Sequence, residues 1–232
     1  MDEEQQPHEG AVLNQQPANL VIVGAGSYGS VIAEIAAECG FIVGQFLDDR
    51  QAVWGTNLDG VPVTGPIERE LRNLDKNQQV AVALGDSDAR MRYLLIAREL
   101  QLGTPALISP GATVSPTAVL EEGIILHHGS HVWTHARIEF GSIISVHATV
   151  AHHAVLGTGS FVSTAANVGA SVHVGERVMV GMNATIITGV RQVAHDGVIG
   201  AGSVVIRDTE PYGVYAGSPA KRIRTRSAKT EI

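Results

Sequence analysis

The sequence has little of what commonly stabilises or anchors a protein. Its 232 residues include one cysteine, Cys39, so no disulfide can form within the chain, and a reducing compartment suits it. Aromatic residues make up only 4% of the chain, so large rings contribute little to its core. No apolar run approaches the roughly 18–20 residues that a membrane-spanning helix needs. Because the net charge is −7, we expect no general attraction to nucleic acid or to an anionic membrane.

The two ends of the chain differ in composition from the rest. The first 18 residues are polar and acidic, without the basic start and apolar stretch of a signal peptide. We therefore expect a disordered leader over residues 1–18 and a cytoplasmic location. The opposite end is locally basic, which indicates a basic C-terminal tail over residues 211–232. Between them, a hydrophobic content of 44% allows a core, and 26 glycines indicate many tight turns.

Residues 19–107 alternate between strand and helix patterns. An apolar run leads into glycines at 24, 26 and 29, and a helical segment then continues to Gly40. A second strand, "FIVGQFLDD", precedes the helix "IERELRNL", and a third, "QVAVALG", precedes the helix "DARMRYLLIAREL". This alternation predicts an α/β, half-Rossmann-like domain with a small parallel sheet.

The glycines follow the pattern Gly24-x-Gly26-x-x-Gly29 between the first strand and its helix. Backbone N–H groups at such a helix N-terminus can hold phosphate, and Asp48 ends the next strand, where it can accept from a ribose or a base. NAD is the usual ligand of this pattern, but about 90 residues provide only one of the two halves that a dinucleotide spans. The glycines could also serve only a tight turn.

After residue 107 the hydrophobic period becomes six. Fourteen consecutive apolar residues have this spacing from Ile108 to Ile186, and after one inserted residue the phase resumes at Val193, Ile199 and Val205. A small residue usually lies four positions after each. Neither a helix nor a flat strand has this period, whereas a three-sided coil with one short strand on each side does. About 17 hexads predict a left-handed parallel β-helix of five to six coils over residues 108–210.

The order of the motifs along the chain is informative. "GAGSYGSVI", "FLDD", "GVPVTG" and "LISPGATVS" precede the hexads, and "VYAGSPAKRIR" follows them. Over residues 19–224 this order resembles the bacterial nucleotide-aminosugar N-acetyltransferases and sialic acid O-acetyltransferases, the NeuD/PglD-type group of hexapeptide acyltransferases. The resemblance implies an enzyme of polysaccharide biosynthesis that uses acetyl-CoA without a metal. It also implies a homotrimer with active sites in the grooves between prisms.

The resemblance also assigns binding residues. It implies that the glycine loop holds the diphosphate of a nucleotide-sugar through Gly24, Gly26, Ser27, Tyr28 and Gly29, with Asp48 and Asp49 near the nucleoside. The family usually has His where Tyr28 stands and often Lys where Ser30 stands. For acetyl-CoA, the resemblance implies backbone contacts at Ala170, Met182 and Ala201 and phosphate contacts from Lys221 and Arg222.

Nine of the ten histidines lie among the hexads, and none occupies an inward position. We expect most of them at solvated or inter-subunit edges. His152 differs, because residues 150–157 align without gaps with the context V-x-H-[DE]-x-x-[IL]-G of the family's proposed general base and depart from it only at 153, and imidazole can take a proton from an attacking amine. His153 replaces the usual carboxylate, so it could orient His152 by a hydrogen bond or contact a substrate. His135, one coil earlier, should stack beside His153. Two further residues differ from those usual in the family: Ser145 stands where Asn is usual, and Phe161 stands where His is usual.

Together these features predict an acetyl-CoA-dependent N-acetyltransferase acting on a nucleotide-linked aminosugar, with His152 as general base and groove N–H groups stabilising the oxyanion. The alternatives are a sialic acid or other sugar O-acetyltransferase and a non-catalytic trimeric sugar-nucleotide-binding protein. His147 and His152 also form the H-x4-H spacing of zinc carbonic anhydrases built on a β-helix. Their third ligand would stand at Gly111, so no metal is expected. The sugar, the nucleotide, the acyl group and the position acylated are not specified by the sequence.

Overall fold

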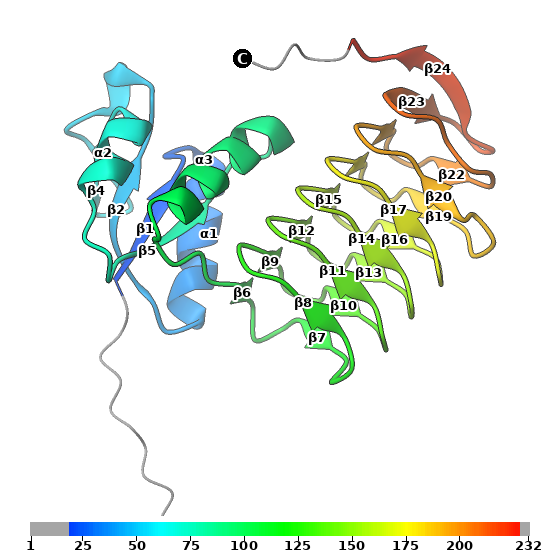
Figure 1. Cartoon of the computed structure of the whole chain (residues 1–232), viewed down its shortest axis with the longest axis horizontal. Coiled ribbons are helices and arrows are strands. Elements are labelled where there is room, and N and C mark those ends of the chain that lie inside the picture. The colour runs from blue at the N-terminus through cyan, green and yellow to red at the C-terminus, as the bar shows by residue number, and fades with distance from the viewer. Residues whose placement is uncertain (1–18, 228–232) are drawn as a thin grey trace, which may run out of the picture.

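The computed structural model describes residues 19–227. An α/β unit lies beside a three-sided prism of stacked coils, and the chain passes from one to the other at β6 (Leu107–Ile108) (Figure 1). The predicted leader, residues 1–18, lies outside the described residues, as do the last five residues of the predicted tail. Within residues 19–227 no helix has both the length and the apolar character needed to cross a bilayer.

The α/β unit is built on a five-stranded sheet in the order β3-β4-β2-β1-β5. All neighbours are parallel except β3, which pairs antiparallel with β4. The strands are β1 (Asn19–Val23), β2 (Ile42–Leu47), β3 (Asn57–Leu58), β4 (Val61–Thr64) and β5 (Gln79–Val82), and the helices are α1 (Ser27–Glu38), η1 (Gln51–Val53), α2 (Ile67–Asn73) and α3 (Ser87–Glu99). The predicted strands and helices are present, and the β3–β4 hairpin was not foreseen.

Alternation along β1 explains the layers of this unit. Leu20 and Ile22 pack with the apolar side of α1, whereas Val21 and Val23 pack with α2 and α3 on the opposite face. Successive side chains of a strand point to opposite faces. An apolar strand without polar alternation is therefore covered on both sides, as β1 is.

The prism contains seventeen two-residue strands, β6 to β22 (Val204–Val205). They form three parallel sheets, in which each strand pairs with the strand eighteen residues away, or nineteen where the inserted residue lies between them: Val132 lies between Val114 and Val150, and Val174 pairs with Val193. The residues of the six-residue repeat point into the axis, and from Leu126 to Val205 they are at most 2% exposed. The chain thus has the left-handed parallel β-helix fold that the period predicts.

The strands run in three columns, which we call the first, second and third sheet. The first sheet begins β6-β9-β12, the second β7-β10-β13 and the third β8-β11-β14. Corner 1 joins the first sheet to the second and includes residues 127–129 and 145–147. Corner 2 joins the second to the third and includes residues 133–135 and 151–153. Corner 3 joins the third to the first and includes residues 139–141 and 157–159.

Every corner of the prism from residue 123 onward turns through a residue with positive φ. From 123 to 183 these residues recur every six positions, and they include His135, His147 and His153, with φ of 56°, 56° and 60°. The left-handed region is restricted for most side chains, and His is among the non-glycine residues found there more often. Three of the histidines therefore occupy corner positions at which the backbone is left-handed.

The α/β unit is packed firmly against the prism. Helix α1 covers the outward face of the first sheet, where Leu107, Ile125 and Ile143 join its core. From α3, the fully buried Arg90 donates to the carbonyl oxygens of Gly141 (2.9 Å) and Gly159 (2.5 Å) at corner 3. Burial lowers the pKa of Arg90 to about 10.

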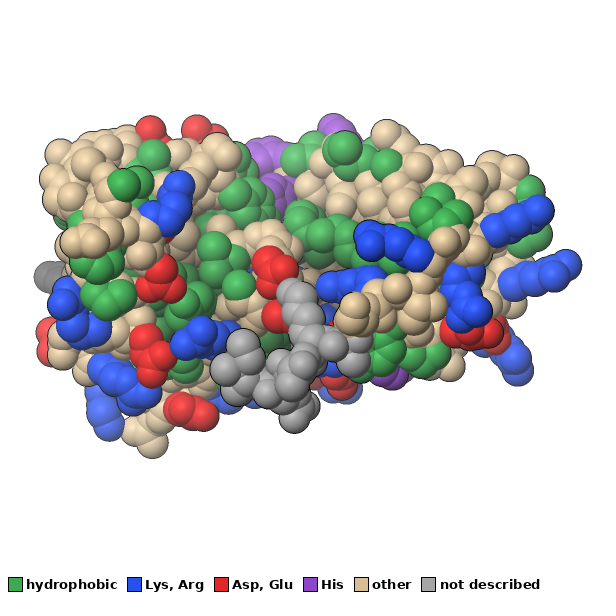
Figure 2. Space-filling view, turned by 90° about the horizontal axis from the view of Figure 1, so that it is seen from above, with side chains coloured by type: hydrophobic (Ala, Val, Ile, Leu, Met, Phe, Trp, Pro, Cys, Tyr) green, Lys and Arg blue, Asp and Glu red, His purple; other side chains and the backbone are tan. Residues whose placement is uncertain are grey.

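The C-terminal segment contributes two further strands. β23 (Gly213–Ala216) extends the first sheet beyond β21 (Val198–Ile199), and β24 (Lys221–Thr225) pairs antiparallel with β23. Lys and Arg side chains gather at this end of the molecule (Figure 2).

Candidate active site

The glycine loop opens onto a pocket of about 360 Å³ in the α/β unit. Gly24 has a φ of +108°, and a Cβ there would lie 2.8 Å from the carbonyl oxygen of Ala83, so glycine is required on both counts. A Cβ at Gly26 would meet nothing within 4 Å, so its backbone is open to a ligand. The lining residues are Gly24, Gly26, Asp48, Asp49, Arg50, Ile67, Ala83, Leu84, Ala89 and Tyr93.

Asp48 is engaged by the protein itself. Its carboxylate accepts from the Ala25 N–H (2.9 Å) and from Nε and a terminal nitrogen of Arg50 (2.9 Å each). Burial raises the pKa of Asp48, but these hydrogen bonds outweigh burial and hold it below the usual value. Asp48 therefore orders the glycine loop, and the positive charge of Arg50, which sequence reasoning missed, lies beside the loop.

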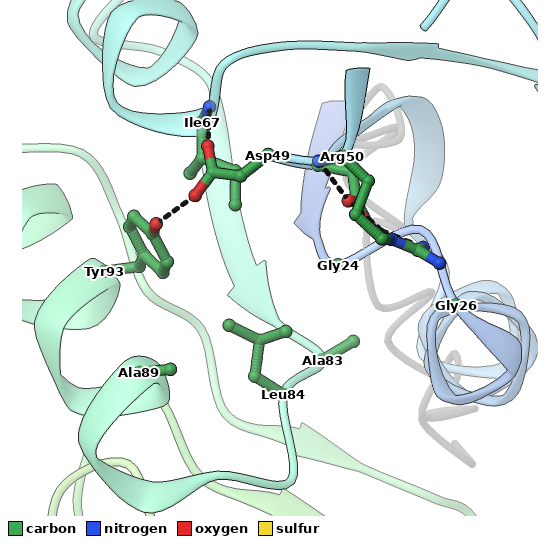
Figure 3. A pocket seen from close by; sticks show the side chains of 10 residues that line it. Gly24, Gly26, Asp49, Arg50, Ile67, Ala83, Leu84, Ala89 and Tyr93 are labelled. Atoms are coloured by element: carbon green, nitrogen blue, oxygen red, sulfur yellow. Dashed lines mark hydrogen bonds and ion pairs between the residues drawn. The ribbon is translucent and has the colours of Figure 1, made fainter. Parts of the chain in front are cut away.

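Asp49 lies on the other side of the same pocket (Figure 3). It accepts from the Ile67 N–H at the start of α2 (2.8 Å) and from the Tyr93 hydroxyl of α3 (2.5 Å). Burial and the hydrogen bond to Asp49 raise the pKa of Tyr93 to about 12, so the phenol stays protonated at neutral pH. Asp49 thus joins three elements around the pocket. Tyr93 carries no sequence signal that would have singled it out.

Tyr28 reaches from the first turn of α1 to the prism. Its hydroxyl lies 3.0 Å from Nε2 of His127, and the two rings stack at 5.8 Å. His127 is only 4% exposed, and burial, with the neighbouring His128, lowers its pKa to about 4. The expectation of a solvated or inter-subunit edge was therefore wrong for His127, because α1 covers its corner of the prism.

His152 and His153 are both exposed at corner 2. Their Nδ1 atoms lie 3.1 Å apart, and the rings meet edge to face. His135 lies beside His153, one coil away as predicted, with ring centroids 5.0 Å apart and the rings tilted by 56°. Histidine side chains gather midway along one edge of the molecule (Figure 2). His153 thus contacts the ring of His152, and it does so from the sequence position at which the family usually has a carboxylate.

A second match to the general-base context was missed. Residues 193–200, Val-Ala-His-Asp-Gly-Val-Ile-Gly, fit V-x-H-[DE]-x-x-[IL]-G with the carboxylate in place. Nδ1 of His195 lies 2.8 Å from the Asp196 carboxylate, which also accepts from Arg177. This dyad lies at corner 3, which one side of the prism separates from corner 1, where Tyr28 makes its contact, and another side separates from corner 2, where His152 lies. The motif alone therefore does not distinguish the two histidines.

The predicted residues divide between two corners. His152, His153 and Ala170 lie at corner 2, and Ala170 stands one coil after His152. Tyr28 contacts corner 1, where Met182 and Ala201 also lie. One side of the prism, six residues or roughly 20 Å at full extension, separates these corners. A single chain therefore does not bring the predicted base and the nucleotide pocket together.

The remaining predicted contacts are less specific. The Ala170 N–H already donates to Thr188 Oγ1 (3.1 Å), and the Met182 side chain is exposed. Lys221 and Arg222 are exposed in β24, where Arg222 pairs with Glu210. His147 lies at corner 1 and His152 at corner 2. Among residues 19–227, no group of three His, Cys, Asp or Glu side chains could hold a metal ion.

Comparison with known proteins agrees with this fold. The PglD N-terminal domain family matches residues 19–95. The acetyltransferase domain of PglB from Neisseria gonorrhoeae is 32% identical with a TM-score of 0.82, over 89% of this chain and all of that one. The same domain in complex with acetyl coenzyme A is 30% identical with a TM-score of 0.73, over the same shares of both chains.

Two further relatives extend the comparison. A histidine variant of GDP-perosamine N-acetyltransferase from Caulobacter crescentus, in complex with CoA and GDP-perosamine, is 31% identical with a TM-score of 0.83, over 88% of this chain and 96% of that one. Chloramphenicol acetyltransferase from Klebsiella aerogenes is 40% identical over 53 residues, which span only 25% of its length. With more than 30% identity to two solved acetyltransferases over nearly their whole length, the chain belongs to the NeuD/PglD-type family of acetyltransferases.

Proposed function

We propose that this chain transfers the acetyl group of acetyl-CoA to the amine of a nucleotide-linked aminosugar. The observation that carries the proposal is the exposed His152, whose Nδ1 faces His153 at 3.1 Å, which leaves Nε2 as the nitrogen available to take a proton. The relatives solved with CoA and GDP-perosamine and with acetyl coenzyme A support both substrates.

The nucleotide binds in the α/β pocket. The open backbone at Gly26 and the N-terminus of α1 provide N–H groups for the diphosphate. Arg50, held beside the loop by Asp48, adds a positive charge. Asp49 and Tyr93 shape the opposite side of the pocket, nearer the nucleoside.

In the proposed reaction, the neutral amine of the sugar attacks the thioester carbonyl of acetyl-CoA while Nε2 of His152 takes the proton of that amine. Backbone N–H groups in the groove stabilise the oxyanion of the tetrahedral intermediate. The intermediate then collapses, the carbon–sulfur bond breaks, and the CoA thiolate receives the proton from His152. His153 is a positioning residue that fixes the ring of His152. It brings no negative charge to stabilise the protonated form, unlike the carboxylate usual at its position.

The active site forms between two copies of the chain. Corner 2 of one copy supplies His152 and Ala170, and corner 1 of the next supplies Met182, Ala201 and the adjoining nucleotide pocket. This division of the predicted residues supports a homotrimer, in which each groove contains corner 2 of one copy and corner 1 of the next. Lys221 and Arg222 extend the groove towards the CoA phosphates.

The test is release of CoA thiol with a panel of acceptors: GDP-perosamine, UDP-glucosamine and sialic acid. Wild type should turn over a nucleotide-aminosugar, and His152→Ala should lower kcat by about 10²- to 10⁴-fold. His153→Ala should lower it less, because only the orienting contact is lost. His195→Ala is the matched control, since it removes the other histidine with the same sequence context, and it should retain activity.

Three outcomes would contradict the proposal. Turnover of sialic acid alone would identify an O-acetyltransferase. Binding of nucleotide-sugars without turnover would identify a binding protein. Loss of activity in His195→Ala but not in His152→Ala would move the base to corner 3.

A further inference from the structure

Trp133 is an exposed aromatic side chain beside the proposed base. It lies at corner 2 in the coil before His152 and is 43% exposed, although the chain has only two tryptophans. Its ring lies 6.4 Å from the ring of His152 and 5.4 Å from that of His131. The positions stacked before and after it hold the small residues Ser115 and Ala151. No large side chain therefore occupies the stacked position directly before or after the indole, whose ring neighbours are His131 and His152 and which stays 43% exposed.

The two substrates must meet at His152 from different directions. The expected CoA contacts, Ala170 among them, lie in the coils after His152, towards the C-terminal end of the prism. The coil before His152 is then left for the acceptor, and Trp133 is the large apolar side chain exposed there at corner 2.

We propose that Trp133 is the platform on which the acceptor sugar ring lies while its amine reaches His152. An indole offers the largest apolar ring surface of any side chain, and binding sites combine such surfaces with a few polar groups. The C–H face of a pyranose fits the indole, and His131 lies at its edge to bond a ring hydroxyl. A deoxy-aminosugar, with a methyl group in place of a hydroxymethyl group, suits this surface best. This inference rests on the proposed function.

The experiment compares Trp133→Ala and Trp133→Phe with Val119→Ala. Val119 is a matched control, because it is an apolar residue 52% exposed on the third sheet, outside corner 2 itself. With GDP-perosamine as the acceptor, Trp133→Ala should raise its KM about tenfold, with the KM for acetyl-CoA nearly unchanged. Trp133→Phe should fall between wild type and Trp133→Ala, and Val119→Ala should match wild type. Replacing GDP-perosamine by UDP-glucosamine should reduce the difference between wild type and Trp133→Ala.

Oligomeric state, measured by light scattering, distinguishes a platform from an interface residue. A Trp133→Ala protein that loses the wild-type oligomer would overturn the inference, as would an unchanged acceptor KM in an active enzyme. Both leave the proposed function intact. If the wild type turns over none of the acceptors, the proposed function fails and this inference fails with it.

Discussion

Individual residues show where a pattern in the sequence is sufficient and where it is not. His135 lies beside His153 because one coil separates them, and their ring centroids are 5.0 Å apart, as the period predicts. His127 is likewise not an inward residue of its hexad, yet it is buried against Tyr28, 99 residues away in the chain. Only the packing of α1 on the prism decides this difference.

The buried His127 makes folding depend on pH. Its pKa is lowered to about 4 from 6.5, so between these values the unfolded chain binds a proton that the folded chain does not. Stability therefore falls as pH decreases through this window. Between pH 7 and pH 5 we expect this group to account for a loss of up to about 2 kcal/mol in the free energy of unfolding.

Urea unfolding at several pH values checks this prediction. His127→Gln keeps a polar partner for Tyr28 but does not titrate, so its stability should fall less steeply than that of wild type between pH 7 and pH 5. Parallel curves for the two proteins would show that His127 is not the source of the dependence.

At the scale of elements, the corners of the prism make specific demands. Gly159 and Gly202 occupy equivalent corner positions with φ of +67° and +66°. A Cβ at Gly159 would lie 2.7 Å from Cγ of Met91 in α3, whereas a Cβ at Gly202 would meet nothing within 4 Å. The two glycines therefore share the same backbone demand but differ in their surroundings.

Substituting alanine at each position separates these effects. Gly202→Ala should cost about 1 kcal/mol for the left-handed conformation. Gly159→Ala should cost that amount and a further ~1–3 kcal/mol, because Met91 must move within a packed junction. Chemical denaturation measures both. Equal losses would mean that α3 moves aside without cost.

The β3–β4 hairpin shows the limit of pattern reading for elements. The prediction of a parallel sheet is confirmed for β1, β2 and β5, but β3 and β4 were not predicted, and β3 has two residues and no periodic signal. Short edge strands are defined by their pairing partner, here β4, and such pairing is not visible in local sequence.

At the scale of the whole molecule, the separation of His152 from the nucleotide pocket leads to a complementation experiment. His152→Ala inactivates corner 2, and Arg50→Glu places a negative charge beside the glycine loop, so each variant alone should be nearly inactive. If sites form between copies, mixed oligomers contain some grooves with both parts intact. Co-expression with two affinity tags and purification through both should recover part of the wild-type activity.

Activity that is not restored in the mixed oligomer would place both parts in one chain. The matched control is a mixture of His152→Ala with His153→Ala. Both changes lie at corner 2, so no groove in the mixture gains the missing histidine from the partner.

The sequence by itself determined the prism. A period of six specifies which residues face the axis, which lie at corners and which stack one coil apart, because these relations depend only on local geometry repeated along the chain. The tertiary structure alone decided how the α/β unit packs on that prism. Arg90 reaches two corner carbonyls, α1 covers His127, and the glycine loop lies by corner 1 while His152 lies at corner 2. These contacts join residues far apart in sequence, and their free energy depends on burial and shape at the junction, which no local pattern encodes.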